Sequence, residues 1–222
     1  MKVEKLISKN QPPNWFNTIT QECRDEYPIH LVDIDASEVV LDVGCNVGGF
    51  SEAWNYRFHN ILAIDASSYN VELYKSRHSH QILHNAIYST DDEIVKLKKY
   101  MGDGDDDTNS GNFSISGFVY ENNNHGASGD EFEEVETISL ETIMKMVGGS
   151  VGLLKIDVEG AEVDAMLNKD LSKIKYITGE FHTFLGKEMQ TNLFNWIETT
   201  HTQLYSMGNG ITSHYQKLWK LK

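Results

Sequence analysis

The sequence has few cysteines, few prolines and no long hydrophobic run. Its 222 residues include two cysteines and three prolines. Cys45 lies inside a glycine-rich segment, where a disulfide would compete with a ligand, so we predict that Cys23 and Cys45 are reduced thiols. The first residues have no continuous apolar stretch typical of a secretory signal, and no segment is long enough to cross a bilayer. We therefore expect a soluble, cytoplasmic protein with no membrane partner.

Positive charge is also scarce. The chain has 19 Lys and Arg residues against 33 Asp and Glu residues, which gives a formal net charge of -14. Such a charge repels a phosphate backbone unless a local basic patch overrides it. The densest basic cluster, Lys96, Lys98 and Lys99, alternates with apolar residues as the exposed face of a strand or helix does. We expect no nucleic-acid partner.

The hydrophobic share of 40% is enough for the core of one large domain. From residue 38 onward, β-branched apolar runs alternate with amphipathic stretches, which is typical of βαβ units around a buried parallel sheet. We predict an N-terminal extension over residues 1–37, with a short helix near residues 15–23. One α/β domain follows over residues 38–222, with a polar insertion over about 101–131.

The predicted elements describe a Rossmann-like fold. Apolar periodicity places strands at residues 39–43, 61–65, 81–87, 152–157 and 176–181, and helices at 49–57, 69–77, 140–147, 161–168 and 187–199. Two more strand-like runs, 113–120 and 132–137, lie in and beside the insertion. The C-terminal segment, 203–221, predicts a hairpin around Gly208-Asn209-Gly210 with an antiparallel final strand. Together these elements predict a mostly parallel seven-stranded sheet with helices on both faces.

The segment VVLDVGCNVGGFS is a strand, a glycine-rich turn and a helix start. Glycines allow close approach of a ligand, and the free N–H groups of the helix favour an anionic or polar one. A dinucleotide fingerprint is incomplete, because Asn46 stands at its middle glycine. The methyltransferase pattern, an acid at the strand end followed by GxxxG, is met by Asp42, Gly44 and Gly48. We predict that Asp42, Gly44, Asn46 and Gly48 bind a cofactor; a tight turn that binds nothing is the alternative.

Asp65 ends the next predicted strand, roughly 20 residues beyond the turn, where an acid can accept hydrogen bonds from two ribose hydroxyls. Ala66 follows it. By analogy of fold, Asn85 and Ala86 would lie near an adenine. A helix-capping role is the alternative for Asp65.

A second acidic turn follows the strand in VGLLKIDVEGAEVDAML. Asp157 and Glu159 come at the carboxyl end of this buried strand, where open parallel sheets bind ligands. Isolated charges are costly to bury, so these carboxylates and Lys155 require a reason. In the alternative interpretation, Glu159 caps the next helix and Lys155 pairs with an acid.

Six segments, in order, resemble the FkbM-type methyltransferases over residues 39–182: DVGCNVGGFS, ILAIDAS, HNAIYS, VETISLETIM, LLKIDVEGAEVDAML and GEFH. The resemblance implies a class I methyltransferase fold, S-adenosylmethionine as methyl donor, and commonly O-methylation of sugar or polyketide hydroxyls. The chain departs from the family at Ala66, where the family often has Glu-Pro after the acid, and in its Asp-rich insertion.

Methyl transfer to a hydroxyl needs alignment of the two reactants and removal of a proton. His182, at the end of the fifth predicted strand and beside Asp157, is the leading predicted general base. Asp157 and Glu159 are the alternatives. These three residues could also hold a divalent ion, although no metal is favoured. The insertion lacks the glycine and glutamate of a calcium loop, and no cysteine–histidine spacing indicates zinc.

The predicted function is therefore S-adenosylmethionine-dependent methyl transfer, with a sugar, glycan or other small-molecule hydroxyl as acceptor. Two alternatives use a similar fold: a nicotinamide-dependent oxidoreductase, and a non-catalytic Rossmann-like binding module.

Overall fold

The computed structural model describes residues 14–99, 113–115, 132–182, 186–208 and 214–222. Most of the predicted insertion, and Asn209 and Gly210 of the predicted hairpin turn, lie outside the described residues. Both cysteines, Cys23 and Cys45, are free.

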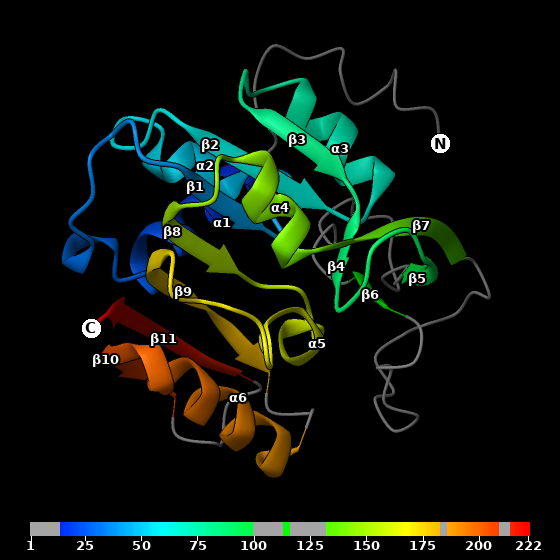
Figure 1. Cartoon of the computed structure of the whole chain (residues 1–222). Helices are drawn as coiled ribbons and strands as arrows, with labels where there is room; N and C mark the ends of the chain where they lie inside the picture. Colours follow the sequence, from blue (N-terminus) through cyan, green and yellow to red (C-terminus); the bar gives the residue numbers. More distant parts are fainter. Residues whose placement is uncertain (1–13, 100–112, 116–131, 183–185, 209–213) are drawn as a thin grey trace.

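A seven-stranded sheet forms the centre of the molecule, in the order β10-β11-β9-β8-β1-β2-β3 (Figure 1). Strand β11 is antiparallel to both of its neighbours, and the other pairs are parallel. The predicted sheet, including its antiparallel final strand, is confirmed. The strands are β1 (Val40–Val43), β2 (Ile61–Asp65), β3 (Gln81–His84), β8 (Val151–Ile156), β9 (Ile174–His182), β10 (His201–Met207) and β11 (His214–Leu221).

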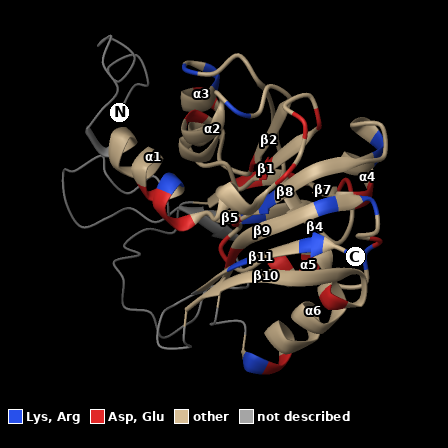
Figure 2. Ribbon diagram, turned by 90° about the vertical axis from the view of Figure 1, so that its left-hand side faces the viewer, with Lys and Arg blue, Asp and Glu red and all other residues tan. Residues whose placement is uncertain are grey.

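Helices cover both faces of this sheet, as Figure 2 shows: α1, α2 and α3 on one side, and α4, α5 and α6 on the other. The strands supply both cores because successive side chains alternate between the faces. Leu41 packs in the core under α4, α5 and α6, whereas Val40 packs with Phe50 of α2 on the opposite face. The helices are α1 (Asn14–Glu26), α2 (Gly49–Trp54), α3 (Ser68–Lys75), α4 (Leu140–Met146), α5 (Glu162–Met166) and α6 (Lys187–Thr200).

Residues before the predicted domain start contribute to this core. Tyr27, Ile29 of the short 3-10 helix η2 (Ile29–Leu31), and Val32 are buried in one cluster with Val40 and Phe50. The predicted N-terminal helix is confirmed as α1. The segment after it therefore packs as part of the α/β core.

A second, four-stranded sheet of order β4-β7-β5-β6 lies beside the first. It consists of β4 (Ala86–Tyr88), β5 (Ile94–Lys99), β6 (Phe113–Ile115) and β7 (Phe132–Ser139). The predicted single strand over 81–87 is wrong: the chain breaks at Asn85, and β4 pairs with β7 instead of extending β3. Asn85 holds this break, because its backbone N–H donates to the Asp65 carbonyl and its side chain to the Glu136 carbonyl.

Candidate active site

An open pocket lies at the carboxyl ends of β1, β2 and β8. Such an edge is where parallel α/β sheets bind ligands. Every predicted cofactor residue except Asp42 and Gly48 lines it, and so do the two predicted catalytic carboxylates. The lining residues are Val43, Gly44, Asn46, Ile64, Asp65, Ala66, Asn70, Asn85, Ala86, Ile87, Leu97, Asp157, Val158, Glu159 and Ala161.

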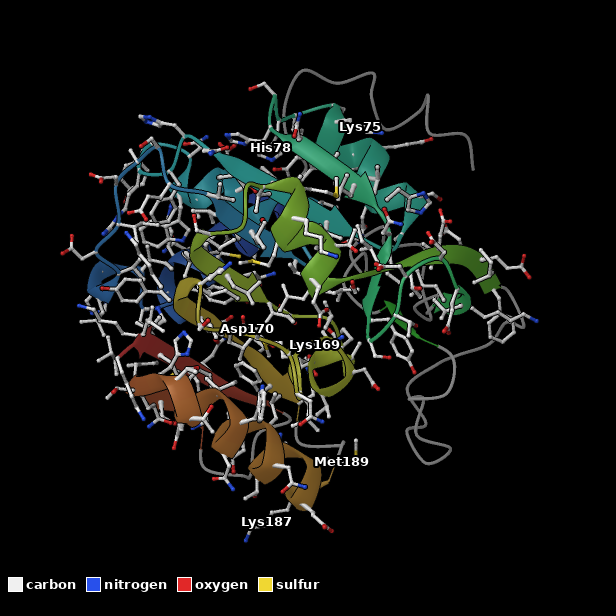
Figure 3. The ribbon with its side chains drawn as sticks, in the orientation of Figure 1. Lys75, His78, Lys169, Asp170, Lys187 and Met189 are labelled. Atoms are coloured by element: carbon white, nitrogen blue, oxygen red, sulfur yellow. The ribbon has the colours of Figure 1, made fainter. Side chains whose placement is uncertain are left out.

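The glycine-rich turn needs its glycines for two different reasons. Gly44 has a φ of +69°, and a Cβ there would lie 1.7 Å from the Asp157 carbonyl oxygen, so this glycine lets two strand ends approach each other. Gly48 has a φ of +94°, and its Cβ would lie 2.4 Å from Nε2 of His78. His78 lies just beyond the end of α3 (Figure 3). Close packing against protein groups thus accounts for both glycines, and their role toward a cofactor stays a prediction.

Replacing Gly44 with Ala should lower the free energy of unfolding by at least about 2 kcal/mol, because the strain of a positive φ adds to the clash with the Asp157 backbone. Urea denaturation measures this. Gly149→Ala is the matched control: its φ is +86°, but nothing lies within 4 Å of the added Cβ. Equal losses in the two variants would show that the close approach to Asp157 contributes nothing.

Asp42 does not line the pocket and instead contacts buried residues next to the glycine-rich turn. It is fully buried, accepts a hydrogen bond from Ser51 Oγ at 2.8 Å, and lies 3.4 Å from Lys155 Nζ. Lys155 also donates to the Gly44 carbonyl at 2.7 Å. Burial opposes the charge of Lys155, but Asp42 and Asp157 outweigh it and raise its pKa. The alternative in which Lys155 pairs with an acid is therefore confirmed, and its hydrogen bond to Gly44 connects the turn to β8.

Asp65 is fixed at the rim of the pocket by three donors. The backbone N–H of Asn46 donates to Oδ2 at 2.8 Å, while the Ser67 N–H and the Asn70 amide donate to Oδ1 at 2.9 and 3.2 Å. The N-cap of α3 is Ser67, not Asp65. Burial raises the pKa of Asp65 to about 6, against these hydrogen bonds, which lower it. Because each carboxylate oxygen has two lone pairs, Oδ2 can still accept from a ligand.

An apolar wall of the pocket escaped the sequence prediction. Leu97 of β5 is buried and packs with Ala86, Val135 and Ala161. The alternation over residues 94–99 was visible, and Lys96 is indeed exposed beside buried Leu97. What the sequence did not reveal is that β5 and β7 bring this face to the end of the main sheet.

Asp157 and Glu159 stand on a tight turn after β8, hereafter the acidic turn (residues 157–160). Glu159 has a φ of +51° and Gly160 a φ of +109°. The side chain of Asp157 is one quarter exposed, and its Oδ2 accepts a hydrogen bond from the Tyr27 hydroxyl at 3.3 Å. Lys155 Nζ lies 3.9 Å from the same oxygen. Asp157 is thus an oriented carboxylate facing the pocket.

His182 is bound by carboxylates at both ring nitrogens. Nδ1 lies 2.9 Å from Oε1 of Glu162, and Nε2 lies 3.2 Å from Oε2 of Glu159. Burial lowers the pKa of His182, but the two carboxylates outweigh this and raise it to about 11. A ring that donates at both nitrogens is a cation and has no lone pair for a proton. The geometry therefore favours Asp157 over His182 as general base, and the role of each stays a prediction.

Asp157 does lie near His182, as predicted. One atom from each of Asp157, Glu180 and His182 lies within 4.8 Å of the others, among the residues with described positions. Both nitrogens of His182 are occupied, and burial, with the Asp157 charge, raises the pKa of Glu180 well above its usual range. A cationic imidazole and a carboxyl that keeps its proton are poor ligands for a divalent ion.

The sheet order, the helices on both faces and the pocket at the strand ends define a class I methyltransferase fold. The family described as "Methyltransferase FkbM domain" matches residues 42–207, so the chain belongs to the FkbM methyltransferases. The sequence-based assignment is confirmed, and the family implies S-adenosylmethionine as donor.

Two solved structures with TM-scores of at least 0.50 agree on the fold. The FkbM methyltransferase from Methylobacillus flagellatus KT aligns with a TM-score of 0.53 and 9% identity over 97% of this chain, which spans 57% of that protein. A chain of a fibrillarin/Nop5p complex gives 0.50 and 11% over 87% and 77% of the two chains. An rRNA methylase from Streptococcus thermophilus gives 0.49 and 8% over 96% and 99%. No curated protein sequence matches this chain. In the described parts of the chain, no helix has the length and apolarity to span a membrane.

Proposed function

We propose that this methyltransferase moves a methyl group from S-adenosylmethionine to a hydroxyl of a sugar, glycan or other small molecule. One observation carries the proposal: a single pocket brings the Asp65 carboxylate together with Asp157 and Glu159. The first is suited to binding ribose hydroxyls, and the other two are suited to accepting a proton from an acceptor.

The pocket suits the donor's parts. At the rim of the pocket, Asp65 has a free lone pair for a ribose hydroxyl. The apolar wall of Ala86 and Leu97 suits an adenine, and Asn85 adds polar groups beside this wall. When bound, the donor supplies an electrophilic methyl group. Two carboxylates on the acidic turn also place negative charge near a cationic sulfonium. A nicotinamide dinucleotide would need the fingerprint glycine that Asn46 replaces.

Asp157 is the proposed proton acceptor. It faces the pocket, and both the Tyr27 hydroxyl and Lys155 keep its carboxylate in one orientation. An oriented carboxylate within reach of a hydroxyl can take its proton as the methyl group is transferred in line. Glu159 lines the same pocket and is the second candidate, but its side chain is held by His182. His182 itself has both nitrogens occupied.

Donor affinity should fall as the pH drops below about 6. The ribose hydroxyls donate to the carboxylate form of Asp65. Burial raises the pKa of this group to about 6, so below that pH the carboxylate is protonated and the hydrogen-bond acceptor is lost. The limiting slope is about tenfold per pH unit. Titration calorimetry with S-adenosylhomocysteine at several pH values measures it, with circular dichroism as a check on folding. An affinity that is constant from pH 7 to pH 5, in a folded sample, would contradict the ribose role of Asp65.

The acceptor class is tested with a donor carrying a deuterated methyl group. The protein is incubated with separate pools of monosaccharides, oligosaccharides, phenols, amines, RNA and protein, and each product is analysed by mass spectrometry with fragmentation. The proposal expects the label on oxygen in a carbohydrate or small-molecule pool. A label only on RNA, protein or nitrogen would overturn the acceptor assignment while leaving methyl transfer in place.

A further inference from the structure

We propose that Glu162 and His182 form a clamp that fixes the shape of the acidic turn, so that both are positioning residues for the reaction. The inference rests on the proposed function, because the acidic turn carries Asp157 and lines the donor pocket. It assigns a role to Glu162, which the mechanism above does not use, and a different role to His182.

Glu162 holds the backbone of the acidic turn. It is fully buried in the first turn of α5. Its Oε1 accepts the backbone N–H of Gly160 at 3.2 Å and of Val158 at 3.4 Å. One carboxylate oxygen therefore accepts hydrogen bonds from the backbone N–H groups on either side of Glu159. A short helix with an acid in its first turn is also electrostatically favoured.

His182 completes the clamp from the neighbouring strand. It ends β9, donates from Nδ1 to the same Oε1 of Glu162, and reaches Glu159 from Nε2. The imidazole thus connects the buried carboxylate under the turn with the carboxylate at its tip. Because Glu159 is a non-glycine residue with a φ of +51°, its backbone is costly and needs such surrounding contacts to persist.

The charges around the ring favour its cationic form. Glu159 and Glu162 bind it directly, and an atom of Asp157 lies within 4.8 Å of it. Glu180 lies within the same distance, but its carboxyl keeps its proton. Lys155 lies 3.9 Å from Asp157, but its charge is shared with Asp42. The second oxygen of Glu162, Oε2, is buried with no hydrogen-bond partner among the described residues. An imidazolium is the counter-charge that such a buried carboxylate needs.

The clamp also connects two segments that the sequence presents separately. Glu162 is the last residue of LLKIDVEGAE, and His182 is the last residue of GEFH. Their side chains meet because β8 and β9 are parallel neighbours, with α5 crossing between them. One physical unit thus explains why an acid follows the acidic turn and a histidine ends the next strand.

The charge state of His182 is the first test. Protein labelled with ¹⁵N-histidine is measured by long-range ¹H–¹⁵N correlation, and the His182 signal is identified by its loss in His182→Gln. Both ring nitrogens should be protonated from about pH 6 to about pH 9, because the two carboxylates raise the pKa of His182 to about 11. A neutral ring at pH 7 would overturn the clamp. This readout requires neither donor nor acceptor, so it is independent of the proposed function.

The second test separates positioning from proton transfer. A clamp predicts that His182→Gln and Glu162→Gln both weaken S-adenosylhomocysteine binding, by roughly tenfold, as well as kcat, by roughly 100-fold, because the displaced turn lines the donor pocket. Glu188→Gln, an exposed acid in the first turn of α6, is the matched control and should behave like wild type. In Glu162→Gln the His182 ring should also lose a proton at a lower pH than in the wild-type protein.

Two results would contradict the clamp. If His182→Gln keeps wild-type donor affinity and loses only kcat, His182 acts as the base instead. If Glu162→Gln leaves both the ring signal and the kinetics unchanged, Glu162 has no positioning role. Failure of wild-type protein to bind S-adenosylhomocysteine would overturn the proposed function and leave the charge-state result valid. Should Glu162→Gln fail to fold, the charge state of His182 in the wild-type protein still tests the clamp.

Discussion

Replacing Asp157 with Asn should lower kcat by roughly 10³-fold while leaving donor affinity nearly unchanged. General bases contribute about 10²–10⁴ in rate, and an amide cannot accept the acceptor's proton. Asn has the size of Asp and can still accept the hydrogen bond from Tyr27, so the pocket should keep its shape. Initial rates with the acceptor found in the labelling screen, together with calorimetry for S-adenosylhomocysteine, measure both quantities.

Glu159→Gln is the matched control for this experiment. It removes the other carboxylate that lines the pocket and weakens one contact of His182. We expect a smaller loss of kcat than in Asp157→Asn. The reverse order, with Asp157→Asn close to wild type, would transfer the role of base to Glu159.

Replacing Asp65 with Asn should weaken donor binding by about 100-fold. One hydrogen bond from a ribose hydroxyl to a carboxylate is worth about 1.5–3 kcal/mol, and a 100-fold loss of affinity corresponds to about 2.7 kcal/mol. The substitution also turns an amide N–H₂ toward a backbone donor, either Asn46 or Ser67. Calorimetric titration with S-adenosylhomocysteine measures the loss.

The control is Asp33→Asn, which removes the same charge from an exposed position. It should bind like wild type, and it should keep the fall in affinity below about pH 6 that Asp65→Asn loses. Urea denaturation of both variants shows whether the protein remains folded. A folded Asp65→Asn protein with wild-type affinity would mean that Asp65 holds the turn at Asn46 and does not contact the donor.

The main sheet and the strand-end carboxylates of the pocket were predictable because their signals are local. Buried parallel strands such as β2 read as continuous apolar runs, and the acid at the end of each run marks the edge where ligands bind. Asp65 and Asp157 could therefore be assigned to one pocket from the sequence, whereas Asn85 was placed there by analogy of fold. The alternating hydrophobicity of the C-terminal strands also predicted the final hairpin.

The second sheet was not predictable, because its strands pair across long separations. β4 pairs with β7 at Ala86 and Thr137, and nothing in either segment specifies that partner. The apolar run over 81–87 was consistent with one strand, and only the backbone contact of Asn85 with Asp65 shows why it breaks. The contribution of Leu97 to the pocket follows from this pairing and was missed with it.

The position of His182 could be predicted from the sequence, but its charge could not. Its position at the end of a strand near Asp157 followed from the strand order. Its charge depends on how deeply it is buried and on a contact with Glu162, 20 residues away in sequence. A histidine between two carboxylates behaves differently from one beside a single acid, and only the packed structure distinguishes them.

The central claim is that the pocket between the glycine-rich turn and the acidic turn binds S-adenosylmethionine. Calorimetric titration of the wild-type protein with S-adenosylmethionine and S-adenosylhomocysteine, with NADH as comparison, tests it most directly. We expect micromolar-range binding of both sulfur nucleosides, about -8 kcal/mol, and no comparable binding of NADH. A folded protein that binds neither sulfur nucleoside, or that prefers NADH, would contradict the account.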